Sequence, residues 1–380
     1  MSSRPLDLIH LVNARSANVG NGALTLGAEA VLSEDLRLPI RWSREAWDDY
    51  SFGTKSFDRA FVDLINASDG MIVGGAVALN GRIHSRNAGM RFDLPLELWH
   101  EVKKPLIFYG LSHRHWPGQV YHHADKLKRA LDVILGRSDM LLALRNDGTR
   151  TWLAKTLGFT SDRLHVVPDS TVFMPAQTDG NYPEIEKGRL NVILSFNDED
   201  REDRYGVPER RMAVIRGLAK AMERLLETTD ANLILAAHYF DDNRMMADFI
   251  DICRPQLAHQ RMISVGSARI SGSPHFYGRY LQADLVISMR VHSMAPCVGL
   301  GVPMVPLVTQ DRMTDFLREV ALDDLAVDAF SDDMAENLSV AIDRTLSNRQ
   351  TVRDRFLQAR ARMRTEAKAF NLKVQALLDA

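Results

Sequence analysis

The chain has 380 residues, of which 46% are hydrophobic and 25% charged, as in globular proteins of more than one domain. Its formal net charge of −2 excludes the strong overall basic field typical of proteins that bind nucleic acid or anionic membranes. Two cysteines argue against a disulfide framework, and no apolar run approaches the roughly 20 residues that span a bilayer.

Short apolar runs alternate with amphipathic segments from the N-terminus onward, which is typical of parallel βαβ units. We interpret the N-terminal segment as a first strand and not as a signal peptide, because Asp7 and His10 interrupt its apolar core. The strands expected in the first half of the chain cover residues 7–13, 70–79, 105–112, 140–145 and 164–169.

A polar stretch rich in Gly, Pro and Asp, residues 176–190, predicts a linker, after which the alternation restarts. The pattern favours an α/β fold of two Rossmann-like domains, residues 1–178 and 189–345, with parallel sheets facing a central cleft. A charged helical tail, 346–380, is expected to pack back on both domains. In the second half we expect strands at 190–197, 231–240, 261–266, 283–289 and 302–308, and helices at 207–227 and 241–257.

The segment ISMRVHSMAPCVGLGVPMVPL, residues 287–307, places an Arg and a His where a buried strand turns into a helix. The helix N-terminus offers free N–H groups, and Arg290 beside it predicts a site for a carboxylate or phosphate. The imidazole of His292 can transfer a proton near neutral pH. The alternative is an Arg–acid pair and a core histidine, but both residues together at a strand end favour function.

Two glycine-containing turns are further candidates for ligand contacts. The turn after the first strand contains Asn18, Gly20 and Asn21 but lacks the dinucleotide-binding spacing. Gly74 and Gly75 directly follow another strand, and their N–H groups could line the same cleft. A simple strand-to-helix turn and a tight turn are the alternative interpretations, and both stay open.

Other charged residues also follow strands. Arg145 ends its strand much as Arg290 does, with a surface ion pair to Asp147 as the alternative. His238 follows the strand LILAA and is expected to line the cleft. The acidic run at 197–204 predicts a solvated loop.

The histidine-rich segment at 113–123 has four histidines but no zinc-site spacing, and no Cys or carboxylate completes a set. We therefore expect no metal site there, and interpret this segment as a substrate-lining loop.

Together these residues resemble the polysaccharide pyruvyl transferase family over about residues 8–325. The matching elements come in the family's order: N-x-G-[DN] at Asn18 to Asn21, Gly-Gly at Gly74 and Gly75, the strand-terminal Arg145, Pro168-Asp169, and R-x-H with G-x-P at Arg290, His292, Gly301 and Pro303.

The resemblance implies a GT-B-like fold and transfer of a pyruvyl group from phosphoenolpyruvate to a sugar of a cell-surface polysaccharide or its lipid-linked precursor. A pyruvate ketal forms, phosphate is released, and no cofactor is needed beyond the donor substrate. His292 is implied as the acid/base group, with Arg145 and Arg290 holding phosphoenolpyruvate. Arg312 stands where the family tends to have Lys, and Asn21 where it usually has Asp, so acceptor choice is open. The acceptor or cleft backbone is assigned to Asn18, Gly20, Asn21, Gly74, Gly75 and His238.

Two other functions fit the same residues: a nucleotide-sugar-dependent GT-B glycosyltransferase, and a non-catalytic sugar- or anion-binding relative. We expect a cytoplasmic enzyme of exopolysaccharide and cell-envelope synthesis that can associate with the inner face of the membrane. Its partners would be phosphoenolpyruvate and a glycan or lipid-linked acceptor, with no nucleic acid. A homo-oligomer remains possible.

Overall fold

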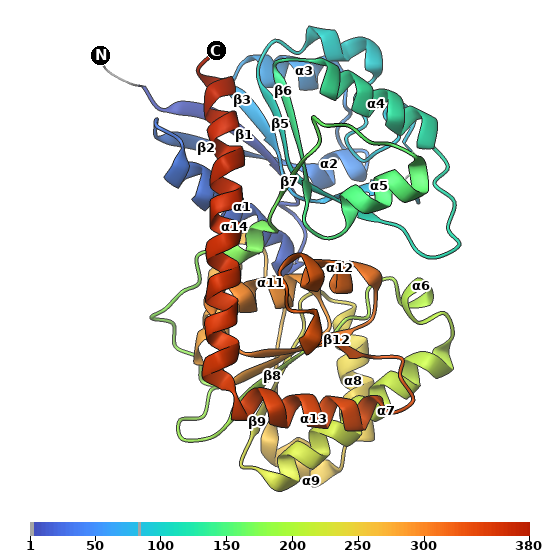
Figure 1. The fold of residues 1–380 in the computed structure, drawn as a ribbon, viewed down its shortest axis with the longest axis vertical. Helices are drawn as coiled ribbons and strands as arrows, with labels where there is room; N and C mark the ends of the chain where they lie inside the picture. Colours follow the sequence, from blue (N-terminus) through green and yellow to red (C-terminus); the bar gives the residue numbers. More distant parts are fainter. Residues whose placement is uncertain (1–3, 83–84) are drawn as a thin grey trace. The chain divides into compact units, whose positions relative to one another are not determined.

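The computed structural model describes residues 4–82 and 85–380, and its contacts divide the chain into two compact units (Figure 1). The division is less simple than the predicted cut after residue 178, because a short segment near the N-terminus belongs with the second half and the C-terminal helix contributes to both units. Of the described residues, unit 1 is formed by those up to Ser16, Leu24–Ser170 and Met363–Ala380, and unit 2 by Ala17–Ala23 and Thr171–Arg362.

Unit 1 contains a parallel sheet whose seven described strands run in the order β2-β1-β3-β5-β6-β7, with β4 paired to β5. This order places the topological switch point, where ligands bind in such sheets, between β1 and β3. The strands are β1 (Leu6–Val12), β2 (Ile40–Ala46), β3 (Gly70–Val73), β4 (Val77–Asn80), β5 (Leu106–Arg114), β6 (Met140–Arg145) and β7 (His165–Val167).

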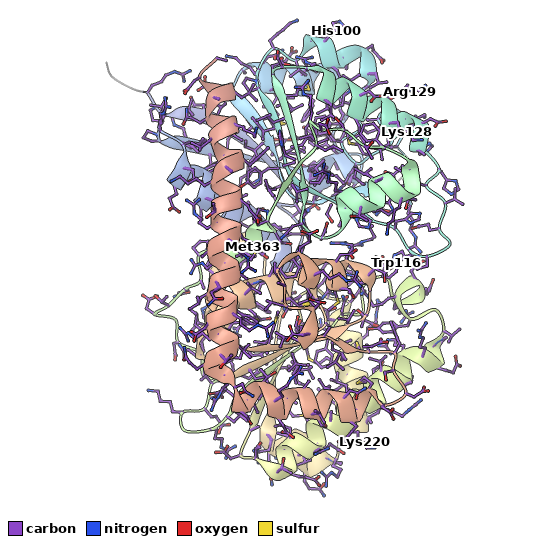
Figure 2. All side chains as sticks on the ribbon, viewed as in Figure 1. His100, Trp116, Lys128, Arg129, Lys220 and Met363 are labelled. Carbon is purple, nitrogen blue, oxygen red and sulfur yellow. The ribbon has the colours of Figure 1, made fainter. Side chains whose placement is uncertain are left out.

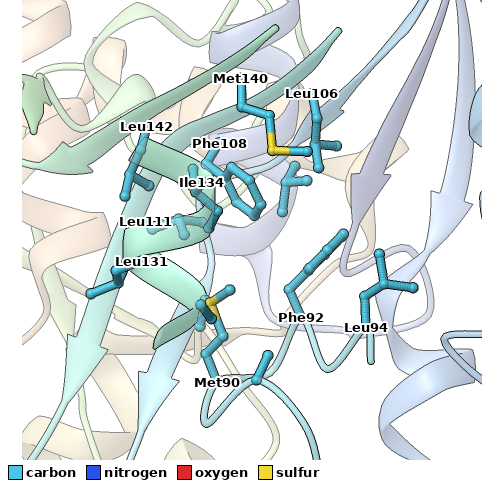
Figure 3. Close-up of a cluster of buried hydrophobic side chains, with 14 of the residues drawn as sticks. Met90, Phe92, Leu94, Leu106, Phe108, Leu111, Leu131, Ile134, Met140 and Leu142 are labelled. Atoms are coloured by element: carbon cyan, nitrogen blue, oxygen red, sulfur yellow. The ribbon is translucent and has the colours of Figure 1, made fainter. Parts of the chain in front are cut away.

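The core of unit 1 lies between this sheet and its helices, and Figure 3 shows part of it. Leu131 and Ile134 of α4 pack with Met140 and Leu142 of β6, and all four side chains are buried. Arg129 of α4 is exposed (Figure 2), so this helix buries only its apolar stripe. The helices are α1 (Val19–Asp35), α2 (Trp47–Ser51), α3 (Arg59–Asn66), α4 (Ala124–Gly136) and α5 (Thr149–Leu157).

Unit 2 contains a second parallel sheet, and its described strands run in the order β10-β9-β8-β11-β12-β13. This is the strand order of a nucleotide-binding Rossmann sheet, whose switch point lies between β8 and β11. The strands are β8 (Asn191–Ser195), β9 (Asn232–Ala236), β10 (Met262–Val265), β11 (Leu285–Ser288), β12 (Met304–Val308) and β13 (Val327–Asp328).

Helices α7 and α13 of unit 2 contact each other and lie side by side in Figure 1. The single helix predicted over 241–257 is two helices, because Pro255 has no N–H group to continue the first and instead begins the second. The helices are α6 (Arg201–Tyr205), α7 (Pro208–Thr228), α8 (Asp242–Ile252), α9 (Pro255–Arg261), α10 (Ser273–Gly278), α11 (Val291–Leu300), α12 (Asp311–Glu319) and α13 (Met334–Ser347). The last helix, α14 (Arg349–Leu378), begins in unit 2 and ends in unit 1.

The predicted linker at 176–190 is packed onto unit 2. Tyr182 is 4% exposed, and Glu184 forms a buried ion pair with Arg279 at 2.6 Å. Among the described residues, no helix combines the length and apolar character needed to cross a membrane.

Candidate functional site

The turn between β11 and α11 has the predicted form. Arg290 is the extended residue that precedes the helix, and its carbonyl accepts hydrogen bonds from the N–H groups of Ser293 and Met294, both at 3.0 Å. The helix ends at Gly301, whose φ of 67° is the left-handed conformation that glycine adopts without strain. His292 therefore lies in the first turn of α11, at the switch-point edge of the sheet.

The Arg290 side chain is almost completely buried and is surrounded by acceptors. Its Nε donates to the Phe196 carbonyl at 3.0 Å, Nη1 to Glu199 at 3.1 Å and Nη2 to Asp242. Burial acts to lower the pKa of the guanidinium, but the charges of Asp242 and then Glu199 raise it above the ordinary value. The Arg–acid pair considered as an alternative is therefore present, at the position expected for an anion site.

The ring of His292 packs against Gly20. A Cβ atom at residue 20 would lie 2.5 Å from Nδ1 and 2.6 Å from Cβ of His292, so only glycine fits there. The hydroxyl of Tyr277 donates to the His292 carbonyl, which fixes the backbone of the same residue. The glycine-containing turn and the R-x-H segment, in which Gly20 and His292 are 272 residues apart, thus meet inside unit 2.

His238 is 0% exposed, so it lies in the interior next to the site and does not line it as expected. Its Nε2 lies 2.9 Å from the Tyr280 hydroxyl, which lies 3.1 Å from the Ser293 hydroxyl. Burial, followed by the positive charge of Arg290, holds the pKa of His238 well below its ordinary value. The imidazole is therefore neutral at pH 7.

The segment before α1 is attached to the strand ends of unit 2. The N–H of Val19 donates to the His238 carbonyl at 3.0 Å, and the side chain of Asn18 accepts from the Gly20 N–H at 3.0 Å. Asn18 therefore shapes this turn, while its side chain and that of Asn21 are partly exposed. Arg312, in the first turn of α12, is also half-buried.

In unit 1, Arg145 is 1% exposed, so the surface ion pair considered for it is instead an interior one. Its Nη1 lies 3.5 Å from Asp169 and 3.9 Å from Asp147, and both carboxylates are 0% exposed. Its Nη2 donates to the Gly75 carbonyl at 3.1 Å. The predicted Arg, Gly-Gly and Pro-Asp elements therefore meet at one edge of this sheet.

Gly74 and Gly75 allow close packing of strand ends. A Cβ at Gly74 would lie 2.6 Å from the His10 Nε2, and one at Gly75 would lie 3.1 Å from the Gly110 carbonyl oxygen. The structure thus gives both glycines a packing role, and contact with a ligand remains a prediction.

The histidine-rich segment does not lie wholly in a loop. His113 belongs to β5, is 6% exposed, and stacks on Trp152 with ring centroids 4.8 Å apart. Within residues 4–82 and 85–380, no group of three or more His, Cys, Asp or Glu side chains is arranged to hold a metal ion.

The sequence interpretation did not identify the partners of the predicted residues. The acidic run was expected to be solvated, yet Asp198 is 2% exposed and Glu199 contacts Arg290. The other acidic partner of Arg290, Asp242, is 0% exposed. The only signal was position, because both loops directly follow strands of the sheet.

Comparison with known sequences decides the family. A sequence model of the polysaccharide pyruvyl transferase family matches residues 18–311, more than three quarters of the 380 residues. The chain belongs to the polysaccharide pyruvyl transferase family. The R-x-H segment, the glycine turn and Arg145 all lie inside the matched region. None of the curated proteins compared with the chain matches it.

Solved structures confirm the predicted GT-B-like α/β fold. A glycosyltransferase from Rickettsia africae ESF-5 has a TM-score of 0.55 at 11% identity, with 99% of each chain covered. UDP-GlcNAc 2-epimerase from Neisseria meningitidis, bound to UDP-GlcNAc, has a TM-score of 0.53 at 9% identity, over 99% of this chain and 100% of that one. An α,α-trehalose-phosphate synthase (UDP-forming) from Burkholderia vietnamiensis has a TM-score of 0.51 at 12% identity, over 99% and 98%. At these identities the likeness concerns the fold alone.

Proposed function

We propose that this protein transfers a pyruvyl group from phosphoenolpyruvate to a sugar of a cell-surface polysaccharide or its lipid-linked precursor. The observation that supports this most directly is His292, held in the first turn of α11 against Gly20 in a chain of this family. Its position at the switch-point edge of unit 2 is where such sheets bind ligands. We place the reaction on the cytoplasmic side of the membrane, where phosphoenolpyruvate is made.

His292 would act as the acid and base. It gives a proton to carbon 3 of phosphoenolpyruvate, and an acceptor hydroxyl forms a bond to carbon 2. The bond between carbon 2 and the phosphate oxygen breaks, phosphate leaves, and a second hydroxyl closes the ketal. Of the two hydroxyl protons, one restores the imidazolium and the other leaves with phosphate. A positioned histidine contributes roughly 10² to 10⁴ in rate to such proton transfers.

The carboxylate and phosphate of the donor require cations. We propose Arg145 and Arg312 for this role. Arg312 is the more accessible of the two, and it follows β12, the parallel neighbour of β11. For the acceptor we propose the partly exposed amides of Asn18 and Asn21, together with the backbone at the Gly20, Gly74 and Gly75 turns, because a carboxylate is missing at position 21.

The purified protein should be incubated with phosphoenolpyruvate or nucleotide sugars and a mixture of sugar acceptors. Acceptor-dependent release of phosphate from phosphoenolpyruvate supports the proposal, whereas release of UDP or GDP instead would identify a glycosyltransferase. His292→Ala should lower phosphate release at least about 100-fold. His259→Ala, at an exposed histidine of α9, is the matched control and should retain wild-type activity.

A further inference from the structure

One side chain spans the switch point of the unit 2 sheet. Arg290 follows β11, and it donates to the carbonyl of Phe196 just beyond β8, to Glu199 in the same loop, and to Asp242 beyond β9. These three strands are neighbours in the order β9-β8-β11. A single guanidinium, with its planar fork of donors, therefore ties three strand ends together.

Asp242 is the acceptor that holds the Arg290 guanidinium in place. Its carboxylate is 0% exposed, and one oxygen accepts the N–H of Asp198 at 3.1 Å in addition to Arg290. The other oxygen accepts the N–H groups of His238 and Tyr239, both at 3.0 Å. Because four donors from three segments converge on it, this carboxylate has one position, and it determines that of the guanidinium.

The local charges make Arg290 a poor attractor of anions. One guanidinium faces two carboxylates at hydrogen-bonding distance, so its field is compensated before a ligand arrives. Only 7% of the residue is exposed.

We infer that Arg290 is a positioning residue held by Asp242, and that its main role is to fix the turn that carries His292. The carbonyl of Arg290 accepts the first hydrogen bonds of α11, so a displacement of this residue moves the start of the helix. His292 lies two residues further on. A kinetic test of this inference rests on the proposed pyruvyl transfer, but a test by guanidinium binding and thermal stability does not.

The kinetic test compares Arg290→Ala, Arg290→Lys and Asp242→Asn at varied phosphoenolpyruvate concentrations. A positioning role predicts that each lowers kcat at least about tenfold and leaves KM for phosphoenolpyruvate within about threefold, whereas loss of an anchor raises KM. Asp251→Asn, an exposed carboxylate on the same helix as Asp242, should behave as wild type. A tenfold higher KM with unchanged kcat in Arg290→Ala, or wild-type kinetics in Asp242→Asn, would overturn the inference. If Asp242→Asn does not fold, Arg290→Lys alone decides, because an ammonium group cannot span the same acceptors.

The second test needs no activity. Guanidinium chloride at millimolar concentration should raise the melting temperature of Arg290→Ala by refilling the site, and should restore part of its kcat. Neither effect should appear in Arg290→Ala combined with Asp242→Asn, or with urea in place of guanidinium. Equal stabilisation of the single and double variants would contradict Asp242 as the holding group. If the wild type releases no phosphate but this pattern holds, the proposed reaction fails while the positioning pair stands.

Discussion

At residue 20, a hydrogen atom occupies the place where any other residue would have a carbon directed at the ring of His292. The contact involves the Cβ of the histidine as well as its ring, so a rotation of the side chain alone cannot relieve it. A glycine in the first turn of α1 is therefore part of the geometry of a residue on α11. Its requirement is steric and not conformational, because its φ is not positive.

We expect Gly20→Ala to displace His292 and to lower phosphate release at least about tenfold. The cost of the added methyl group to folding should be roughly 1–3 kcal/mol, as for overpacked cores. Initial rates and urea unfolding on the same preparation measure both effects. Gly136→Ala is the control, since a Cβ there meets no atom within 4 Å. Wild-type rates in Gly20→Ala would show that the His292 ring does not need its present position.

His238 should make the stability of the protein depend on pH. Burial, then the charges of Arg290, His292 and Arg279, lower its pKa in the folded state, while an unfolded histidine titrates near about 6.5. Below that pH the unfolded chain binds a proton that the folded chain does not, so stability is present above about pH 6.5 and is lost as pH falls.

Relative to His238→Gln, the wild type should lose up to about 1.4 kcal/mol of unfolding free energy per pH unit below about pH 6.5. Urea unfolding of both proteins between pH 7.5 and 5.5 measures the difference. His165, whose pKa is also lowered by burial, titrates in both proteins and cancels. If the unfolding free energies of the two proteins fall in parallel with pH, then protonation of His238 in the folded state costs no free energy.

Among the elements, α11 approaches the turn that contains Val172 without intervening side chains. A Cβ at Gly299 would lie 2.0 Å from the Val172 carbonyl oxygen, and backbone cannot move aside as a flexible side chain can. Gly299 thus allows the helix to pack directly against the backbone of this turn.

Gly299→Ala should lower the free energy of unfolding by about 3 kcal/mol, at the upper end of overpacking costs. Chemical denaturation measures this value, with Gly266→Ala, where an added Cβ meets nothing within 4 Å, as the control. Equal stability of the two variants would mean that α11 can shift away from Val172 at little cost.

The elements also show which features a sequence can predict. The strand β6, Met140–Arg145, was predicted residue for residue, because a strand buried on both faces is apolar throughout. The edge strand β2, Ile40–Ala46, was missed, since none of its residues is buried and it carries no apolar run. The role of Asp242 could not be predicted either, because its partner Arg290 is 48 residues away and only the strand order brings them together.

Across the whole molecule, each unit contains a buried arginine at the end of a strand of its sheet. Each of these arginines is paired with two carboxylates: Arg145 with Asp147 and Asp169, and Arg290 with Asp242 and Glu199. The sequence indicated both arginines and, as the alternative, an acidic partner for each, but it did not indicate that these pairs are buried. A cation that ends a buried strand among polar loops is stabilised by acids from neighbouring strand ends, so such arginines rigidify the edge where ligands bind.

The C-terminal helix α14 belongs to both units, and its final turns complete the core of unit 1. Phe370 is 3% exposed, and its ring lies 5.6 Å from that of Tyr109 on β5. The next residue, Asn371, accepts the Tyr109 hydroxyl at 3.0 Å and donates to Asp35 at 2.8 Å. Unit 1 therefore cannot bury its sheet fully until the last residues of the chain are in place.

We expect Phe370→Ala to destabilise the protein by about 3–5 kcal/mol, the usual cost of deleting a buried aromatic ring. Leu372→Ala, two residues along the same helix but 56% exposed, is the control and should change stability by less than about 0.5 kcal/mol. Hydrogen exchange should show the loss of protection in β5 and β6 of unit 1, because Phe370 packs on this sheet. If exchange increases only within α14, then the sheet of unit 1 is stable without the packing of this helix.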